Sequence, residues 1–333
     1  MSRAAGSSAR VSVIMTCYNE GCYIGEAVRS VLDQTRADCI ERVIIADDGS
    51  RPDTLAVLRD IERWDPRILV LYGPGGVGLP GQRCAAIAQA RSELLAILDG
   101  DDVWAPDKLE RQLPVLAERS EVGLVYADYF TFADGDRSAA RRAGVLDISG
   151  AVSRHRARGG EPLVRRYFLN DPPIIPSTTL LRRCAYEASG GFDPAVRVFE
   201  DTDFYVRLAR VTQFALVSEP LLYKRNRDSS ITGGRKDLMA HHAFVALKAA
   251  AAEPELLPLV PRRLAERARK LGNQRFLFND VAGAVGLLKF AVRLDPGNYR
   301  AWCSLLAAGV FPGLALRLLG RRGRARQAAL GVA

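Results

Sequence analysis

The stretch LLAILDGDDVW occupies residues 94–104. Its five apolar residues, 94–98, predict a short buried strand, and Asp99, Asp101 and Asp102 follow within four positions. Crowded carboxylates repel one another unless a cation or a positively charged ligand neutralises them. Their hard oxygen atoms suit Mg²⁺ or Mn²⁺, and Mg²⁺ is commonly shared between one or two carboxylates and substrate phosphates. One interpretation is a metal site at a strand end, and the other is a solvated acidic turn that caps the next helix.

Three further apolar strands precede this one, at residues 11–15, 43–46 and 68–71. Segments with the helical period of apolar residues separate them, and this alternation indicates a parallel sheet covered on both faces. We therefore expect an α/β fold with a mostly parallel central sheet and helices on both faces. Ligands of such sheets bind beyond the carboxyl ends of the strands. The polar residues at 16–20, 47–50 and 99–101 each follow a strand, so they should meet in one crevice.

Composition limits the partners and the compartment. The 333 residues include 47 Lys and Arg and 38 Asp and Glu, which gives a net charge of +9. This excess suits an anionic partner, namely a nucleotide, a membrane surface or a nucleic acid. Six cysteines form no CxxC pair, which favours reduced thiols in the cytoplasm over a disulfide framework or a zinc site. The first ten residues have no hydrophobic core, so we expect no signal peptide.

A glycine-rich run at residues 73–81, GPGGVGLPG, has the composition of a phosphate-binding loop. Its spacing does not fit G-x-x-x-x-G-K-[ST], and it does not follow the first strand as a dinucleotide fingerprint does. We interpret it as a flexible connector over the crevice. Arg83 begins the helix after it, where the guanidinium and backbone N–H groups could face an anion, although a plain surface arginine is an equal alternative.

Residues 11–50, which contain VSVIMTCYNE and VIIADDGS, and residues 94–109, LLAILDGDDVWAPDKL, resemble the family 2 glycosyltransferases. The resemblance extends over about residues 10–230, and four separate elements match in order and spacing. It implies a GT-A fold, a nucleotide-sugar donor and an inverting transfer. The fold class expected is thus α/β of the GT-A type, with an additional helical region at the C-terminus.

The resemblance also implies roles for individual residues. It implies nucleotide-sugar binding by Thr16, Tyr18, Glu20, Asp47, Asp48, Arg83, Asp99 and Gly100. The D-x-D pair, Asp99 and Asp101, is implied to hold the metal, with Asp101 the more direct ligand and Asp99 nearer the ribose. These roles are chemically reasonable, because a carboxylate can accept from a uracil N–H and a divalent cation neutralises the leaving diphosphate. The cofactor expected is Mg²⁺ or Mn²⁺.

Residues 198–204, VFEDTDF, match the family's Glu-Asp pair at a helix start. The resemblance implies that the general base is Asp201, because an inverting transfer needs one carboxylate to deprotonate the attacking hydroxyl. The alternative is that these acids, Glu200 among them, only favour the helix N-terminus. Ser177 and Thr178, in a proline-rich loop, are candidates with Glu200 for an acceptor site, although a turn role is equally expected.

The character of the sequence changes after residue 232. We expect a catalytic domain over 1–232, with nucleotide-sugar binding in about 10–127 and acceptor binding and catalysis in about 128–232. Residues 233–333 form a separate region, which reads as helices rich in Ala, Leu and Arg.

The C-terminal region has two notable segments. Residues 272–300 resemble one tetratricopeptide unit, but no second copy is visible, so we expect a helical hairpin. The apolar segment 302–319 is followed by an arginine-rich segment, 320–326, without any acid. This pattern suits contact with an anionic membrane, and it equally suits a helix packed on the domain with a solvated basic tail.

Three classes of function fit the acidic strand end. The first is a metal-dependent glycosyltransferase of the cytoplasm, or of the inner face of the cell membrane, that moves a sugar from a UDP-sugar to a glycan or lipid-linked acceptor in cell-surface polysaccharide synthesis. The second is a sugar-phosphate nucleotidyltransferase, but that class places a glycine-rich loop where this chain has TCYNE. The third is a non-catalytic nucleotide-binding protein. A nucleic-acid partner is not expected, because no basic stripe with interleaved aromatic residues is present.

Overall fold

The computed structural model describes residues 9–133, 136–145, 163–170, 174–227 and 238–310. These residues form two compact units. The first contains the described residues within 1–132, 136–163 and 172–225, and the second contains those within 133–135, 164–171 and 226–333. The short helix near residue 165 therefore belongs to the same compact unit as the C-terminal helices.

The first half of the central sheet is parallel because its strands alternate with helices. Strands β1 (Val11–Cys17), β2 (Ile40–Asp47), β3 (Ile68–Tyr72) and β4 (Leu94–Asp99) are adjacent in the order β3-β2-β1-β4. All neighbouring pairs among them are parallel. Every residue of β1 is buried, and so is all of β4 except its last residue, as expected for strands covered on both faces.

The second half of the sheet contains antiparallel pairs, so the nine-stranded sheet is mixed rather than mostly parallel. The remaining strands are β5 (Val103–Trp104), β6 (Val122–Ala133), β7 (Asp136–Arg142), β8 (Leu180–Arg182) and β9 (Gln213–Asn226). β4 pairs with β8 and β8 with β6, both antiparallel, and β9 and β5 follow at the edge. The parallel arrangement stops at β4 because the regular alternation of strand and helix ends there in the sequence.

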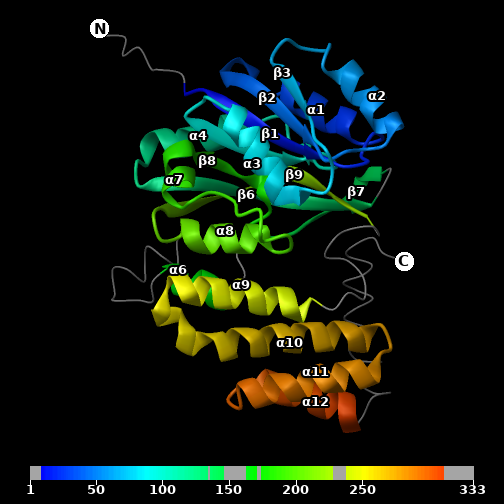
Figure 1. Ribbon diagram of the computed structural model, residues 1–333, viewed down its shortest axis with the longest axis vertical. Helices are drawn as coiled ribbons and strands as arrows, with labels where there is room; N and C mark the ends of the chain where they lie inside the picture. Colours follow the sequence, from blue (N-terminus) through cyan, green and yellow to red (C-terminus); the bar gives the residue numbers. More distant parts are fainter. Residues whose placement is uncertain (1–8, 134–135, 146–162, 171–173, 228–237, 311–333) are drawn as a thin grey trace. The chain divides into compact units, whose positions relative to one another are not determined.

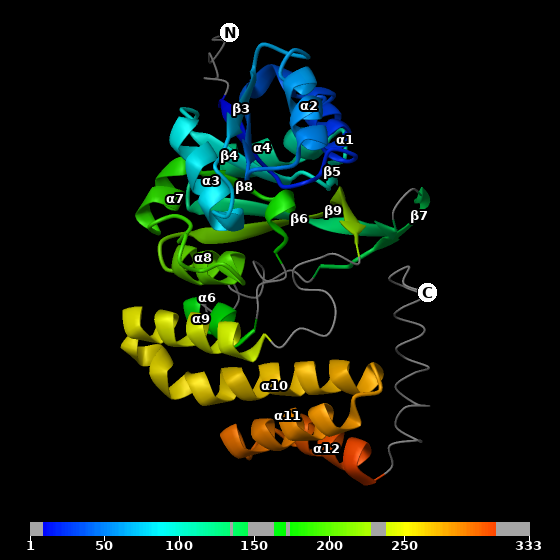
Figure 2. The same cartoon turned by 45° about the vertical axis from the view of Figure 1, so that its right-hand side comes forward.

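Helices cover both faces of this sheet. Those of the first unit are α1 (Ile24–Leu32), α2 (Pro52–Ile61), α3 (Gly78–Gln89), α4 (Lys108–Glu118), α7 (Arg183–Ala188) and α8 (Glu200–Leu208), with short 3₁₀ turns at η1 (Ala37–Cys39) and η2 (Pro176–Thr178). α1 and α2 lie on one side of β1–β3 and α3 lies on the other (Figure 1, Figure 2). α1 buries Ile24, Ala27, Val28 and Val31, which is the apolar stripe that predicted a helix.

The second unit is helical. Its helices are α6 (Leu163–Leu169), α9 (Met239–Ala252), η3 (Pro254–Leu259), α10 (Val260–Leu277), α11 (Val281–Leu294) and α12 (Tyr299–Val310). α10 and α11 approach closely at Gly272, where a Cβ would lie 2.9 Å from Leu288 Cγ. The Asp280 side chain caps α11 by accepting from the backbone N–H of Gly283 at 2.9 Å. Within the described residues, every helix falls short of the length and apolarity needed to span a bilayer.

Candidate active site

Three neighbouring strand ends form the floor of the site. In the register of the sheet, Thr16 of β1 is opposite Asp99 of β4, and Cys17 of β1 is opposite Asp47 of β2. Thr16 Oγ1 donates a hydrogen bond of 3.2 Å to Asp99 Oδ1. The convergence of the polar strand ends, which the sequence predicted, is therefore confirmed as a feature of the fold.

Gly100 lets the backbone after β4 approach the turn after β1. A Cβ on Gly100 would lie 2.5 Å from Glu20 Oε2 and 2.6 Å from the carbonyl oxygen of Thr16. No ordinary side chain fits at such distances, so Gly100 brings Glu20, Thr16 and the D-x-D segment into one close-packed group. The role of Gly100 in this structure is to make room for these neighbours.

Arg83 connects the end of β4 with the start of α8. Its guanidinium donates from Nη2 to Asp99 Oδ1 at 2.8 Å and from Nη1 to Glu200 Oε1 at 2.7 Å. Only 1% of the side chain is exposed, and the guanidinium carbon lies 5.2 Å from the centre of the Phe192 ring. Burial alone would raise the pKa of Asp99, but the Arg83 charge holds that pKa below its ordinary value. Arg83 is thus a buried bridge between two carboxylates, and its expected part in nucleotide-sugar binding stays a prediction.

Helix α8 begins with three acidic residues. Phe199 precedes it in the left-handed conformation (φ 62°), and Glu200, Asp201 and Asp203 occupy the first turn. Asp201 is half-buried, and its Oδ1 accepts from the Thr202 backbone N–H at 2.6 Å. Asp203 instead pairs with Arg207 at 2.7 Å inside the fold. The three acids therefore differ: Glu200 binds Arg83, Asp203 is structural, and the half-buried Asp201 lies one residue from the bridge.

Two basic residues that the sequence reasoning missed lie beside the D-x-D segment. Arg225, near the end of β9, donates from Nε to the Asp101 carbonyl at 3.0 Å and from its backbone N–H to Asp102 Oδ1 at 3.0 Å. Burial would lower the pKa of Lys224, but Asp102, Asp101 and Asp99 raise it above its ordinary value. The only sequence signal is the basic pair Lys224-Arg225 after an apolar strand, and nothing local connects that pair with residues more than a hundred positions earlier.

Asp102 is the most buried carboxylate of this segment. Its side chain is 1% exposed, and burial, together with the charges of Asp101 and Asp99, raises its pKa to about 7 although Lys224 opposes the shift. Because Asp102 accepts from Arg225 inside the protein, it supports the segment from within. The half-buried Asp101 and Asp99 are the members that remain near the surface.

The two aspartates after β2 are also bound to nearby backbone. Asp48 accepts from the backbone N–H groups of Val77 and Gly78, both at 2.8 Å, and so fastens the glycine-rich run. Asp47 Oδ2 accepts from two backbone N–H groups, those of Gly49 and Ser50, at 3.0 Å each, while its buried Oδ1 has no hydrogen-bond partner among the described residues. Asp47 therefore fixes the turn after β2 through Oδ2, while its Oδ1 is an unsatisfied buried acceptor in the described part of the chain. Tyr18, which directly follows the last residue of β1, is 59% exposed.

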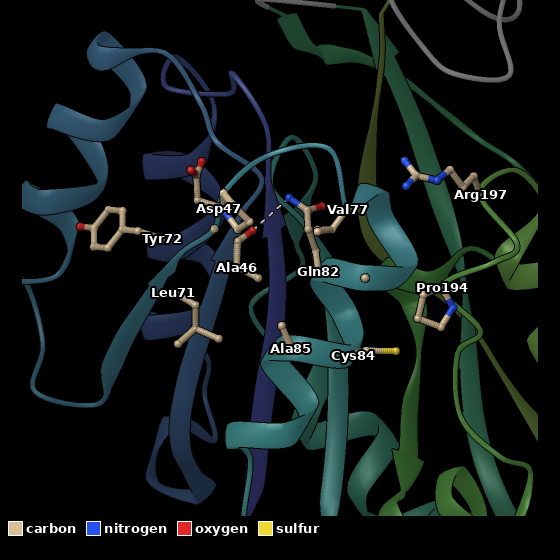
Figure 3. Close-up of a pocket in the computed structure, with 13 residues that line it drawn as sticks. Ala46, Asp47, Leu71, Tyr72, Val77, Gln82, Cys84, Ala85, Pro194 and Arg197 are labelled. Carbon is tan, nitrogen blue, oxygen red and sulfur yellow. Dashed lines mark hydrogen bonds between the residues drawn. The ribbon is translucent and has the colours of Figure 1, made fainter.

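A pocket of about 520 Å³ lies beneath the glycine-rich run, lined by residues of β2, β3 and α3 and by Arg197 (Figure 3). Gln82 of α3 donates to the carbonyl groups of Ala46 at 3.2 Å and Cys17 at 2.7 Å, which holds the helix against the strand ends. Arg197 donates to the Gly76 carbonyl at 2.7 Å. The pocket adjoins Asp47 but does not include the D-x-D residues.

Ser177 and Thr178 differ from the expectation that they line an acceptor site. Both are fully buried in η2, with 0% exposure. Ser177 Oγ accepts from the Asp99 backbone N–H at 3.1 Å, and Thr178 Oγ1 donates to the Ile175 carbonyl at 2.7 Å. A fully buried hydroxyl cannot contact an incoming acceptor, so Ser177 supports the D-x-D strand and Thr178 closes its own turn.

The carboxylate oxygens at this strand edge suit a metal ion that a bound phosphate also coordinates. Among the described residues, no three His, Cys, Asp or Glu side chains form a group that could hold a metal. Asp99 and Asp101 supply two carboxylates, and both side-chain hydrogen bonds of Asp99 go to Oδ1. Mg²⁺ and Mn²⁺ suit a site made of one or two carboxylates, water and phosphate oxygens. The residues present therefore fit a metal that phosphates complete.

This chain is similar to known glycosyltransferases in sequence and in fold. The model of the family described as "Glycosyl transferase family 2" matches residues 12–190, which is more than half of the chain. TuaG of Bacillus subtilis, whose name connects it with teichuronic acid biosynthesis, is 42% identical over 110 residues; these make up 33% of this chain and 43% of TuaG.

Two solved structures show the same fold. TarS of S. aureus in complex with UDP-GlcNAc has a TM-score of 0.58 and 16% identity, over 94% of this chain and 92% of TarS 1–349. The mannosyltransferase PcManGT of Pyrobaculum calidifontis, in complex with GDP-Man and Mn²⁺, has a TM-score of 0.60 and 20% identity, over 97% of this chain and 85% of PcManGT. The chain belongs to glycosyl transferase family 2, and its GT-A fold, which the sequence resemblance implied, is confirmed.

Replacement of Arg83 by Met should lower the free energy of unfolding by about 3–5 kcal/mol, because two carboxylates would lose their shared buried cation. Chemical denaturation measures this change. Arg51→Met is the matched control, since the Arg51 side chain is 70% exposed and should cost within about 0.5 kcal/mol. If both variants unfold at the same denaturant concentration as the unaltered protein, Arg83 does not hold these elements together.

Proposed function

We propose that this chain transfers a sugar from a nucleotide-diphosphate sugar to a hydroxyl of a glycan or lipid-linked acceptor, with inversion at the anomeric carbon. One observation supports this most strongly. Arg83 holds Asp99, at the strand ends where the donor would bind, and Glu200, which directly precedes the half-buried Asp201. One buried arginine thus joins the donor edge to the residue directly before the candidate base, and a single displacement requires such positioning of the two.

Asp201 is the proposed general base. The acceptor hydroxyl is a weak nucleophile until a positioned carboxylate takes its proton. In the proposed step, the proton passes to Asp201, the oxygen forms a bond with the anomeric carbon, and the bond from that carbon to the diphosphate breaks on the opposite face. Glu200 is less suited to this role, since its carboxylate is bound to Arg83.

The proposed donor is a UDP-sugar. The ring of Tyr18 is exposed and can stack on a base, while Asp47 Oδ1 offers an acceptor for a base or ribose N–H or O–H. Asp48 would contribute mainly by fixing the glycine-rich run, because both of its oxygens already accept from backbone N–H groups. The complex of TarS with UDP-GlcNAc supports uridine, although PcManGT binds GDP-Man in the same fold.

Asp101 and Asp99 are the proposed ligands of Mg²⁺ or Mn²⁺. When bound, such an ion supplies positive charge that stabilises the leaving diphosphate. The chain's own contribution is electrostatic: Arg83 lowers the pKa of Asp99, and Lys224 adds a positive charge near Asp99, Asp101 and Asp102. The presence of Mn²⁺ in the PcManGT complex supports this assignment.

The proposed setting is the synthesis of a cell-surface polysaccharide or glycoconjugate from cytoplasmic donors. The similarity to TuaG, with its name in teichuronic acid biosynthesis, supports this setting. We further propose that the sheet-containing unit carries the donor site and the base, while the C-terminal helices contribute to where in the cell the protein is located.

Replacement of Asp201 by Asn should reduce sugar transfer by about 10²–10⁴-fold while UDP binding stays unchanged, because the variant keeps the shape but loses the base. Transfer assays and calorimetry with UDP measure the two effects. Asp53→Asn is the matched control, since Asp53 also lies in the first turn of a helix but is 73% exposed.

Two results would count against this mechanism. A variant with near wild-type turnover would move the base elsewhere, with Glu200 the next candidate. A product whose NMR spectrum shows the donor's own anomeric configuration would exclude a single displacement.

Removal of divalent metal should abolish turnover of the donor, because Asp99 and Asp101 place negative charge where a diphosphate must bind. Nucleotide release from a UDP-sugar in EDTA, with and without excess Mn²⁺, tests this. We expect excess Mn²⁺ to restore activity in the unaltered protein and to do so poorly in Asp101→Asn. Full activity of either protein in EDTA would contradict a metal requirement.

A further inference from the structure

Helix α12 is apolar on both its inner and its outer side. Ala301 and Ala308 face inward, with 0% and 3% exposure, and pack on α10 and α11. Tyr299, Trp302 and Leu306 follow each other at spacings of three and four, so they share one outer side, and they are 68%, 45% and 59% exposed. An apolar side of a helix is normally covered by another part of a protein or by an apolar phase. The outer side formed by Tyr299, Trp302 and Leu306, called here the α12 face, therefore lacks its cover in the described part of the chain.

Exposed apolar side chains are concentrated in this region. Of the twelve large apolar residues that are exposed among the described ones, nine lie between residues 244 and 306. The described residues of the sheet-containing unit include only three, Tyr18, Tyr72 and Val211. Single exposed apolar residues need no explanation, but a concentration of them indicates a surface that contacts another apolar phase or partner.

Positive charge is concentrated in the same region. Residues 1–237 contain 32 Lys and Arg and 33 Asp and Glu, so they are close to neutral. Residues 238–333 contain 15 Lys and Arg and only 5 Asp and Glu, which accounts for the whole positive excess of the chain. Arg300 lies on α12 beside Tyr299, and its Nε donates to the Tyr299 hydroxyl at 3.2 Å. The C-terminal part of the sequence thus carries the basic excess, and Arg300 lies beside the apolar α12 face, a combination that suits binding to the surface of an anionic bilayer.

Trp302 has the chemistry of an interfacial anchor. Its indole Nε1 donates to the Pro296 carbonyl in the α11–α12 turn at 2.9 Å, so the ring lies near the end of the hairpin with its polar atom satisfied. An aromatic ring with a satisfied polar tip is favoured where an apolar phase meets water. We propose that the α12 face docks on an anionic membrane surface, with Tyr299, Trp302 and Leu306 entering the headgroup boundary and Arg300 facing the lipid charge.

Flotation of the full-length protein with vesicles tests this. We expect binding to vesicles made of equal parts phosphatidylglycerol and phosphatidylcholine, no binding to phosphatidylcholine alone, and release at high salt because the charge contribution is screened. Leu306→Glu should lower the partition coefficient by at least about tenfold, since it removes an inserted side chain and adds a repelled charge. Val211→Glu, at a 46% exposed apolar site outside this region, should bind as the unaltered protein does.

A second variant tests whether a loss of vesicle binding could result from misfolding of the first. Trp302→Glu should give the same loss, with thermal unfolding and UDP binding unchanged in both variants. Three results would contradict the proposal. The first is that the protein does not bind anionic vesicles at low salt, and the second is that Leu306→Glu binds them as well as the unaltered protein does. The third is that the protein binds dextran sulfate but not vesicles. A dimer that Leu306→Glu dissociates would also overturn the proposal, because a second copy would then cover the face. Vesicle binding needs no sugar donor, so the proposed transfer reaction can fail without affecting this test.

Discussion

The buried pairing of Arg83 with Asp99 and Glu200 is the interaction on which the candidate site depends. Two carboxylates from distant parts of the chain share one guanidinium that is almost entirely out of water. Removing one partner would leave buried charge uncompensated, and this costs about 3–5 kcal/mol. The pairing therefore fixes the end of β4 relative to the start of α8. Since Asp99 belongs to the donor edge and Asp201 follows Glu200, the same contact sets the distance between the two halves of the proposed reaction.

The mixed sheet explains how further support reaches this edge. Parallel strands bring the ends of β1, β2 and β4 together, because all three run in the same direction. The antiparallel half of the sheet places residues from the second part of the chain at the same edge. Ser177 precedes β8 and binds the backbone of Asp99, and Arg225 near the end of β9 binds Asp101 and Asp102. The acidic edge is thus held from both directions, which allows like charges to remain close.

The sequence predicted the features of the fold that depend on residues close together in the chain. Continuous apolar runs predicted the four parallel strands, and the rule that parallel strands end at one edge predicted that Thr16, Asp47 and Asp99 would be neighbours. The roles of individual residues were harder to predict. For Arg83 the sequence left two positions open, one facing an anion at a helix start and one on the plain surface. The side chain is instead buried with Asp99 and Glu200, which lie 16 and 117 positions away. The supporting role of Ser177 and the contacts of Arg225 were not predicted for the same reason, since no local pattern encodes a contact made between distant segments.

The most direct test of the central claim is a double-mutant cycle between Asp99→Asn and Glu200→Gln, measured as the free energy of unfolding. Asp99 and Glu200 are joined through Arg83, so their effects should be non-additive by about 0.5–3 kcal/mol. In an Arg83→Met background this coupling should disappear. Effects that add within about 0.5 kcal/mol in the unaltered background would contradict the claim that one buried arginine joins the donor edge to the helix of the proposed base.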